Sequence, residues 1–152
     1  VIKHFPGLGG TDEDPHVTLG KVEAVDWLVY KELLPDSLGV MVTHVRLADD
    51  DLPCSISVNC LSQLDLSNVV IFSDALEMKG VSVVHNENEV AVRALKAGVD
   101  VLVYGPGVDG ENLLAIYKHL IGEYSLDQEL AKRIDFVYEK LSGQRKNELS
   151  DR

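Results

Sequence analysis

The amino-acid sequence predicts an α/β fold in which about four parallel strands and their helices form part of a (β/α)8 barrel. Short runs rich in Val and Ile alternate with helical patterns along the 152 residues. These runs are continuously apolar, which is typical of parallel strands buried on both faces. Polar, chemically capable side chains end successive runs, as on the catalytic face of a barrel. The strand–helix order implies right-handed βαβ units.

Four apolar runs are expected to form the strands: Val1–Phe5, Gly39–Val45, Asn68–Ser73 and Val99–Tyr104. Between the first two, apolar residues recur at helical spacing from Val22 to Leu33, and Pro35 ends that helix. Trp27 lies within it and is interpreted as a packing residue rather than a platform for a sugar ring.

Helical patterns also follow the third and fourth runs. Glu89 stands four residues before Arg93, and Gly98 supplies a C-terminal stop. An apolar stripe from Leu113 to Leu120 indicates a further helix.

The last helix is expected to open at a capping box formed by Ser125 and Gln128 and to end at about Leu141. The domain division predicted from this pattern is a barrel part over residues 1–142 and a polar, flexible tail over residues 143–152.

Composition narrows the class of protein. A chain of 16.7 kDa with 45% hydrophobic and 26% charged residues has the balance of one soluble globular domain. No apolar run approaches the roughly 18–20 residues of a membrane span. The formal net charge of −11 opposes nucleic acid and anionic membranes as partners, because both require a basic face.

The two cysteines, Cys54 and Cys60, show neither a CxxC pattern nor a histidine spaced for zinc. The cysteine pattern therefore predicts two free thiols in a reducing compartment and no zinc site.

The expected strands end in polar residues that would meet at one edge of a parallel sheet. The first ends in Lys3-His4, the second in Thr43-His44 and the third in Ser73-Asp74. A glycine-rich and then acidic loop follows the first strand and carries Asp14 and His16 two residues apart. A carboxylate that holds an imidazole in this way gives a plausible acid/base pair.

Several segments resemble glycoside hydrolase family 3, in the order that the family has them. Residues 3–9 (KHFPGLG) are similar to its KHFPGHG motif, and residues 14–16 (DPH) to the Asp-Ser-His of its bacterial β-N-acetylglucosaminidase branch. Residues 42–45 resemble its AHV strand, residues 69–80 (VVIFSDALEMKG) its VVFSDDLxMKG segment, and residues 91–102 its AVxALxAGxDxLL segment. The resemblance implies the C-terminal half of the family's catalytic barrel.

The resemblance also implies roles for individual residues. Asp74 would be the nucleophile that forms a covalent glycosyl-enzyme, and His16 the acid/base, oriented by Asp14. Lys3 and His4 would hydrogen-bond the sugar hydroxyls, and no metal or organic cofactor would be required.

Further residues of the matching segments belong to the same expected pocket. His44 and Met78 are expected to contribute to substrate binding, and the alternative for His44 is that it only caps its strand. Glu77 is interpreted as a solvated acid in the first turn of a helix. Three positions depart from the family pattern: Leu8 replaces a histidine, Pro15 replaces a serine and Ala75 replaces a second aspartate.

By resemblance, the activity would be that of a retaining β-N-acetylglucosaminidase acting on cell-wall fragments in the cytoplasm during peptidoglycan recycling. The family's earlier strands, which supply an aspartate and arginines for the sugar, have no counterpart in this sequence. The N-terminal half of the barrel is therefore an expected partner, in the same chain or in another. A family 3 β-glucosidase and a non-catalytic half-barrel that serves binding or assembly are the alternatives.

Overall fold

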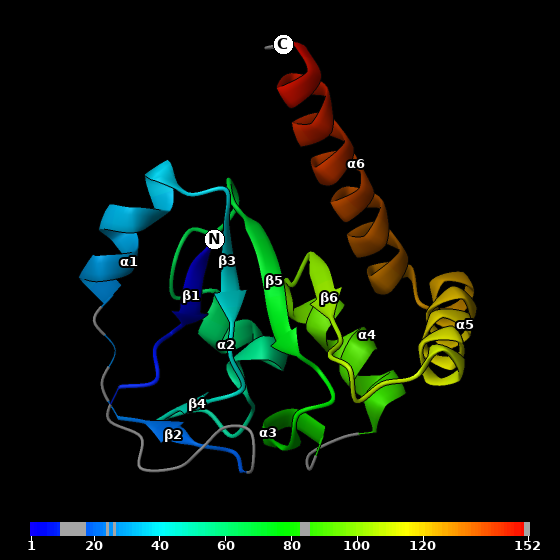
Figure 1. Cartoon of the computed structure of the whole chain (residues 1–152), viewed down its shortest axis with the longest axis horizontal. Coiled ribbons are helices and arrows are strands. Elements are labelled where there is room, and N and C mark those ends of the chain that lie inside the picture. The colour runs from blue at the N-terminus through cyan, green and yellow to red at the C-terminus, as the bar shows by residue number, and fades with distance from the viewer. Residues whose placement is uncertain (10–17, 24, 26, 83–85, 151–152) are drawn as a thin grey trace.

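The main sheet has four parallel strands in the order β1-β3-β5-β6 (Figure 1). The computed structural model of the chain describes residues 1–9, 18–23, 25, 27–82 and 86–150. The strands are β1 (Ile2–Phe5), β3 (Gly39–Val42), β5 (Val70–Ala75) and β6 (Val101–Val103). Each strand overlaps one of the four predicted runs, and their parallel pairing confirms the predicted fold class.

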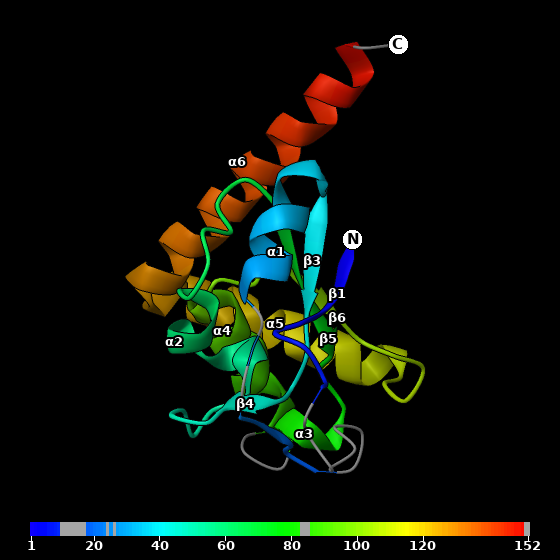
Figure 2. The same cartoon turned by 90° about the vertical axis from the view of Figure 1, so that its left-hand side faces the viewer.

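Helices pack against this sheet mainly from one side. Figure 2 shows α1, α2 and α4 beside the same face, with α3 beyond the carboxyl ends of the strands. The helices are α1 (Trp27–Leu33), α2 (Val58–Leu61), α3 (Lys79–Ser82), α4 (Glu87–Ala97), α5 (Gly110–Leu126) and α6 (Gln128–Ser150). The core between sheet and helices includes Phe5, Val40, Val42, Ile71 and Val99.

The helix expected from Val22 begins later than predicted. Val22 belongs instead to β2 (Lys21–Val22), which pairs in parallel with β4 (Arg46–Leu47) in a separate two-stranded sheet. Among the described residues between Val22 and Leu33, the helical ones are those of α1, and Pro35 lies in the 3-10 turn that follows it. The interpretation of Trp27 as a packing residue is confirmed, because its ring lies 5.9 Å from that of Phe5 between centroids.

The predicted capping box at Ser125 and Gln128 is wrong. Ser125 lies inside α5, and the cap of α6 is Asp127, whose Oδ1 accepts hydrogen bonds from the backbone N–H groups of Glu129 and Leu130. The two patterns share a polar residue before an apolar run, and the sequence spacing alone does not separate them. Helix α6 continues to Ser150, beyond the expected end near Leu141.

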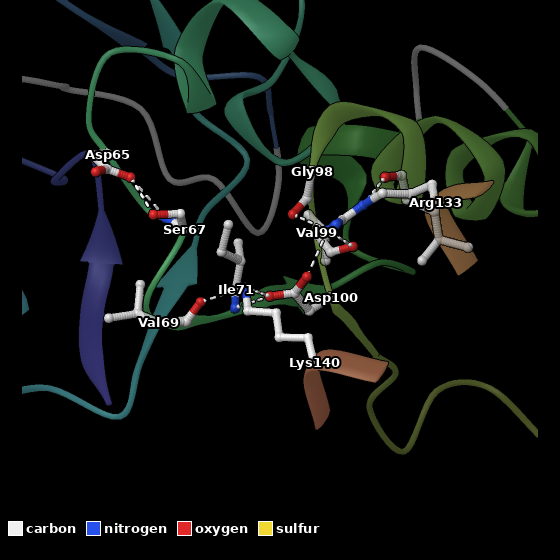
Figure 3. Close-up of polar contacts among 10 residues, drawn as sticks. Asp65, Ser67, Val69, Ile71, Gly98, Val99, Asp100, Arg133 and Lys140 are labelled. Atoms are coloured by element: carbon white, nitrogen blue, oxygen red, sulfur yellow. Dashed lines mark hydrogen bonds and ion pairs between the residues drawn. The ribbon is translucent and has the colours of Figure 1, made fainter. Parts of the chain in front are cut away.

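Helix α6 is fixed to the amino ends of β5 and β6 by a buried ion cluster (Figure 3). The side chain of Asp100 is fully buried and accepts bonds from Arg133 Nη2 and Lys140 Nζ, both at 2.6 Å. Its Oδ2 also accepts the backbone N–H of Ile71 at 2.9 Å. Two cations and one amide thus satisfy a carboxylate that would be costly to bury alone.

The same two cations also bind main-chain oxygens. Arg133 donates to the carbonyl groups of Leu95, Gly98 and Val99, and Lys140 donates to that of Val69 at 2.8 Å. Three of these carbonyls lie close to the points where β5 and β6 begin, so the cluster ties α6 to both strands at once.

The prediction of two free thiols is wrong, because Cys54 and Cys60 form a disulfide. A 3-10 turn at Cys54–Ile56 and the short helix α2 bend the chain back within six residues, which brings the two Cα atoms to 5.2 Å. That distance lies in the range that a disulfide requires. Both cysteines are fully buried. The pairing depends on this local fold, and the sequence separation of the two cysteines alone does not predict it.

Removal of the charge at Asp100 should destabilise the protein. Asp100→Asn leaves two buried cations without their counter-ion, so we expect the free energy of unfolding to fall by about 3–5 kcal/mol. Urea denaturation followed by circular dichroism measures the change. The matched control is Asp65→Asn, since Asp65 is exposed and binds only Ser67. Equal midpoints for the two variants would contradict a structural role for the cluster.

The disulfide predicts the thiol content directly. The purified protein, denatured without reductant, should show no reaction with a thiol reagent, and reduction should release both of its two cysteines. Two reactive thiols before reduction would show that the bond does not form where the protein is made.

Candidate active site at the carboxyl ends of the strands

The carboxyl ends of the parallel strands meet at one edge of the sheet, where the sequence places its reactive residues. Lys3 and His4 lie in β1, His44 follows β3, Asp74 lies in β5, and Tyr104 follows β6. In barrels this edge is the one that carries the chemistry. The expectation that these strand ends lie together is therefore met, while the roles of the residues remain predictions.

Asp74 lies at an irregularity of β5. Phe72 pairs with Val101 and Ala75 with Val103. The chain thus advances by three residues in β5 and by two in β6 between these pairs, so β5 contains one extra residue. The hydroxyl of Ser73 accepts the backbone N–H of Val103 at 2.8 Å in this interval. Such bulges re-aim side chains next to active sites. The apolar run that predicted this strand does not indicate the bulge.

The Asp74 carboxylate is held by the backbone that follows it. Its Oδ1 accepts the N–H of Ala75 at 2.8 Å, and the side chain is only half-buried. A hydrogen bond from the backbone limits the rotation of the carboxylate. Asp74 is therefore an oriented carboxylate at the carboxyl end of β5.

His44 lies inside the protein, and its expected contribution to substrate binding stays a prediction. Its exposed fraction is 0%. The ring Nδ1 lies 2.8 Å from Ser55 Oγ, and Nε2 lies 2.9 Å from the carbonyl oxygen of Ala75. His44 therefore contacts the backbone of the residue directly after Asp74.

The strand that carries Lys3 and His4 is also irregular. Ile2 pairs with Val40 and Phe5 with Val42, and the Lys3–His4 and Phe5–Pro6 peptide bonds are cis. Lys3 is exposed and His4 half-buried, so both side chains are accessible. Helix α1 contacts this strand, where Tyr30 Oη donates to the carbonyl of His4 at 3.2 Å.

The loop that carries the expected acid/base pair lies outside the residues that the structure describes. Asp14 and His16 both fall in this stretch, so their roles stay predictions. Met78 is half-buried one turn after Asp74, and its N–H donates to the Ala75 carbonyl at 3.0 Å.

The interpretation of Glu77 as a solvated helix acid is wrong. Glu77 precedes α3, and its Oε1 accepts the N–H of Gly105 at 2.8 Å, so it links the end of β5 to the end of β6. Its Oε2 is buried. The position three residues after Asp74 was the only signal, and it does not distinguish a solvated acid from a bridging one.

Three buried side-chain oxygens in the described part of the chain have no hydrogen-bond partner there: Thr43 Oγ1, Glu77 Oε2 and Tyr104 Oη. All three follow the carboxyl ends of strands. Burial raises the pKa of Tyr104 to about 12, and the negative charges of Glu87 and Glu77 add to this shift. Tyr104 is therefore a neutral hydrogen-bonding group at ordinary pH. Sequence reasoning identified Tyr104 only as a strand end.

Comparison with known proteins places the chain in a family. Residues 1–134 match the model of the glycosyl hydrolase family 3 N-terminal domain. The chain belongs to glycoside hydrolase family 3. A β-hexosaminidase of Idiomarina loihiensis is 35% identical over 113 residues, which cover 66% of this chain and 34% of that protein. One of Methylobacillus flagellatus is 33% identical over 140 residues, covering 83% and 40% respectively.

Solved structures give the same picture of the fold. A β-N-acetylglucosaminidase of family 3 from Paenibacillus sp. str. FPU-7 superposes with a TM-score of 0.73 at 26% identity, over 91% of this chain and 30% of that one. A β-N-acetylhexosaminidase from Beutenbergia cavernae gives a TM-score of 0.79 at 21% identity, over 95% and 46% respectively, which concerns the fold alone. The chain thus spans about a third to two fifths of the length of the curated relatives named above.

The contact between Glu77 and Gly105 should be sensitive to a single methyl group. A Cβ at position 105 would clash with Glu77 Oε1, whereas one at position 107 would make only an ordinary contact at 3.7 Å. We expect Gly105→Ala to lower the free energy of unfolding by about 1–3 kcal/mol and Gly107→Ala to change it little. Chemical denaturation of both variants measures this, and equal effects would argue against the bridge.

Proposed function

We propose that this chain carries the nucleophile of a retaining β-N-acetylglucosaminidase. The observation that carries the proposal is the place of Asp74: a half-buried, oriented carboxylate at the bulged carboxyl end of β5. Membership of glycoside hydrolase family 3 and the similarity to β-hexosaminidases support the reaction class.

In the proposed reaction, one oxygen of the Asp74 carboxylate attacks the anomeric carbon of the sugar. The bond from that carbon to the leaving oxygen breaks, and His16 donates its proton to the departing oxygen. His16 then takes a proton from water, whose oxygen attacks the same carbon and releases Asp74. Asp14 keeps the imidazole oriented. No cofactor is consumed, because each proton that His16 gives is recovered from water.

Lys3 and His4 are proposed to hydrogen-bond hydroxyl groups of the sugar, and Met78 to line the same pocket. The exposure of Lys3 and the partial exposure of His4 support this role. At the same edge of the sheet, Glu77 and Tyr104 each keep a buried oxygen that has no hydrogen-bond partner among the described residues, and these oxygens add acceptor and donor capacity there.

The N-terminal half of the barrel is the proposed partner, in the same chain or in another. Strands β1 and β6 are the two edges of the described sheet, and exposed edges invite further pairing. Helix α5 supports the proposal because it exposes large apolar residues: Leu113, Leu114, Tyr117, Ile121, Tyr124 and Leu126. Such a surface is typical of a face that another segment covers.

The proposed setting is peptidoglycan recycling in the cytoplasm, with cell-wall fragments as substrate, which the family resemblance suggests. Among the described residues, no helix is long and apolar enough to cross a membrane. The Cys54–Cys60 disulfide is the feature that favours an oxidising compartment instead.

A chromogenic β-N-acetylglucosaminide tests the activity. We expect turnover by a form of the protein extended with the missing strands, and little by residues 1–152 alone. Asp74→Asn keeps an acceptor for the Ala75 N–H but removes the nucleophile, so kcat should fall by about 10³-fold or more. His16→Ala should also reduce kcat sharply. Asp65→Asn is the matched control and should be fully active.

Labelling with a mechanism-based fluorosugar identifies the nucleophile independently. The sugar should attach to Asp74, and attachment to another carboxylate would overturn the assignment. Faster turnover of a β-glucoside would favour the β-glucosidase alternative. A well-folded extended protein with no turnover of either sugar would favour a non-catalytic module.

A further inference from the structure

We propose that His44 is a positioning residue that sets the place of Asp74 by holding the Ala75 carbonyl as the Nε2–H tautomer. Its catalytic consequence rests on the proposed function, whereas the tautomer and the hold on Ala75 do not. The argument begins with the directions of two hydrogen bonds. A carbonyl oxygen only accepts, so the 2.9 Å contact with Ala75 requires a proton on Nε2.

The other ring nitrogen is then an acceptor in the neutral imidazole. Ser55 Oγ lies 2.8 Å from Nδ1, and a hydroxyl can donate to it. The Ala75 carbonyl thus selects the tautomer, and the Ser55 hydroxyl, which can donate or accept, is compatible with it when it donates to Nδ1. Both residues are 0% exposed, so water does not compete for these bonds.

Ala75 connects this pair to the carboxylate. Its N–H donates to Asp74 Oδ1 at 2.8 Å, while its carbonyl accepts from His44 and from the N–H of Met78. Every bond to the Ala75 backbone therefore bears on where the Asp74 side chain lies. The register shift between β5 and β6 ends at Ala75, and the N–H of Leu76 donates to the Val103 carbonyl at 3.0 Å directly after it. The bond from His44 therefore acts on the residue at which the shift ends.

Ser55 is itself held firmly. It lies in the 3-10 turn Cys54–Ile56, and the disulfide from Cys54 to Cys60 closes the next bend of the chain. The N–H of Cys54 donates to the carbonyl of Val45 at 2.8 Å, so this turn is tied to the segment that directly follows His44. Supporting groups whose own positions are locked are what a precise site requires.

Two substitutions of His44 separate positioning from simple packing. In Gln, the side-chain amide nitrogen corresponds to the histidine Nε2, so His44→Gln keeps a donor for the Ala75 carbonyl. In Asn, the amide group corresponds to Nδ1, so His44→Asn keeps only the contact with Ser55. Both variants lose the buried ring, and we expect both to lose stability by similar amounts.

The first readout uses residues 1–152 without substrate. Nitrogen-15 NMR of the unsubstituted protein should show His44 protonated at Nε2 and not at Nδ1. The Ala75 amide signal and its slow hydrogen exchange should persist in His44→Gln and be lost in His44→Asn. A proton on Nδ1 alone, or equal disturbance of Ala75 in both variants, would overturn the proposal.

The second readout uses the extended, active protein. Because misplacement by about 1 Å can cost 10²-fold, we expect kcat to fall by about 10²-fold in His44→Asn and only a few-fold in His44→Gln, with KM nearly unchanged in both. Equal losses of kcat would contradict a positioning role. If the unsubstituted extended protein shows no turnover, the proposed function fails, and the NMR measurements alone decide whether His44 holds Ala75.

Discussion

The parallel pairing of four short strands is the constraint on which the rest of the molecule depends. Parallel strands all end at the same edge, so residues far apart in the chain, such as Lys3, Asp74 and Tyr104, are brought to one edge of the sheet by the strand order. Parallel strands also need crossovers, which the helices provide and which cover one face of the sheet. The strand order therefore determines which residues can form the site, and the side chains at those positions determine its chemistry.

The two ends of the sheet differ in how their polar groups are satisfied. At the amino ends, the Asp100 carboxylate is saturated by Arg133, Lys140 and a backbone amide. At the carboxyl ends, Glu77 and Tyr104 keep buried oxygens without partners in the described part of the chain. A saturated network stabilises, and unsatisfied groups are a cost that folds retain mainly where a site needs them. In barrels, the face at the carboxyl ends of the strands carries the catalytic residues, and the face at the amino ends contributes to stability. The contrast between the two ends of this sheet agrees with that pattern.

The sequence predicted those features that depend on local pattern and order. Continuous apolar runs located all four strands, and Gly98, whose φ is +124°, was correctly identified as the stop of α4. Features that depend on tertiary contact were missed. Val22 fits a helical stripe but pairs with Leu47, because short strand pairing overrides a weak periodicity.

The candidate site shows the same limit. Asp74 was identified from its strand end and from the family resemblance, whereas the inward direction of His44 and the bridge of Glu77 depend on bulges and turns that no spacing encodes. The disulfide was missed for a similar reason, since a separation of six positions in the sequence fits a bend or an extended segment equally well.

The hydrogen bonds of Arg133 bear on which substitutions this domain can accept near the start of β6. The guanidinium donates to three main-chain oxygens, and only its bond to Asp100 involves another side chain. It therefore recognises the path of the backbone rather than the identity of residues 95, 98 and 99. Arg133 therefore places no demand on the side chains at positions 95, 98 and 99, although the φ of +124° at Gly98 and the burial of Leu95 and Val99 restrict them independently. The carboxylate of Asp100 and its two cations, by contrast, depend on one another.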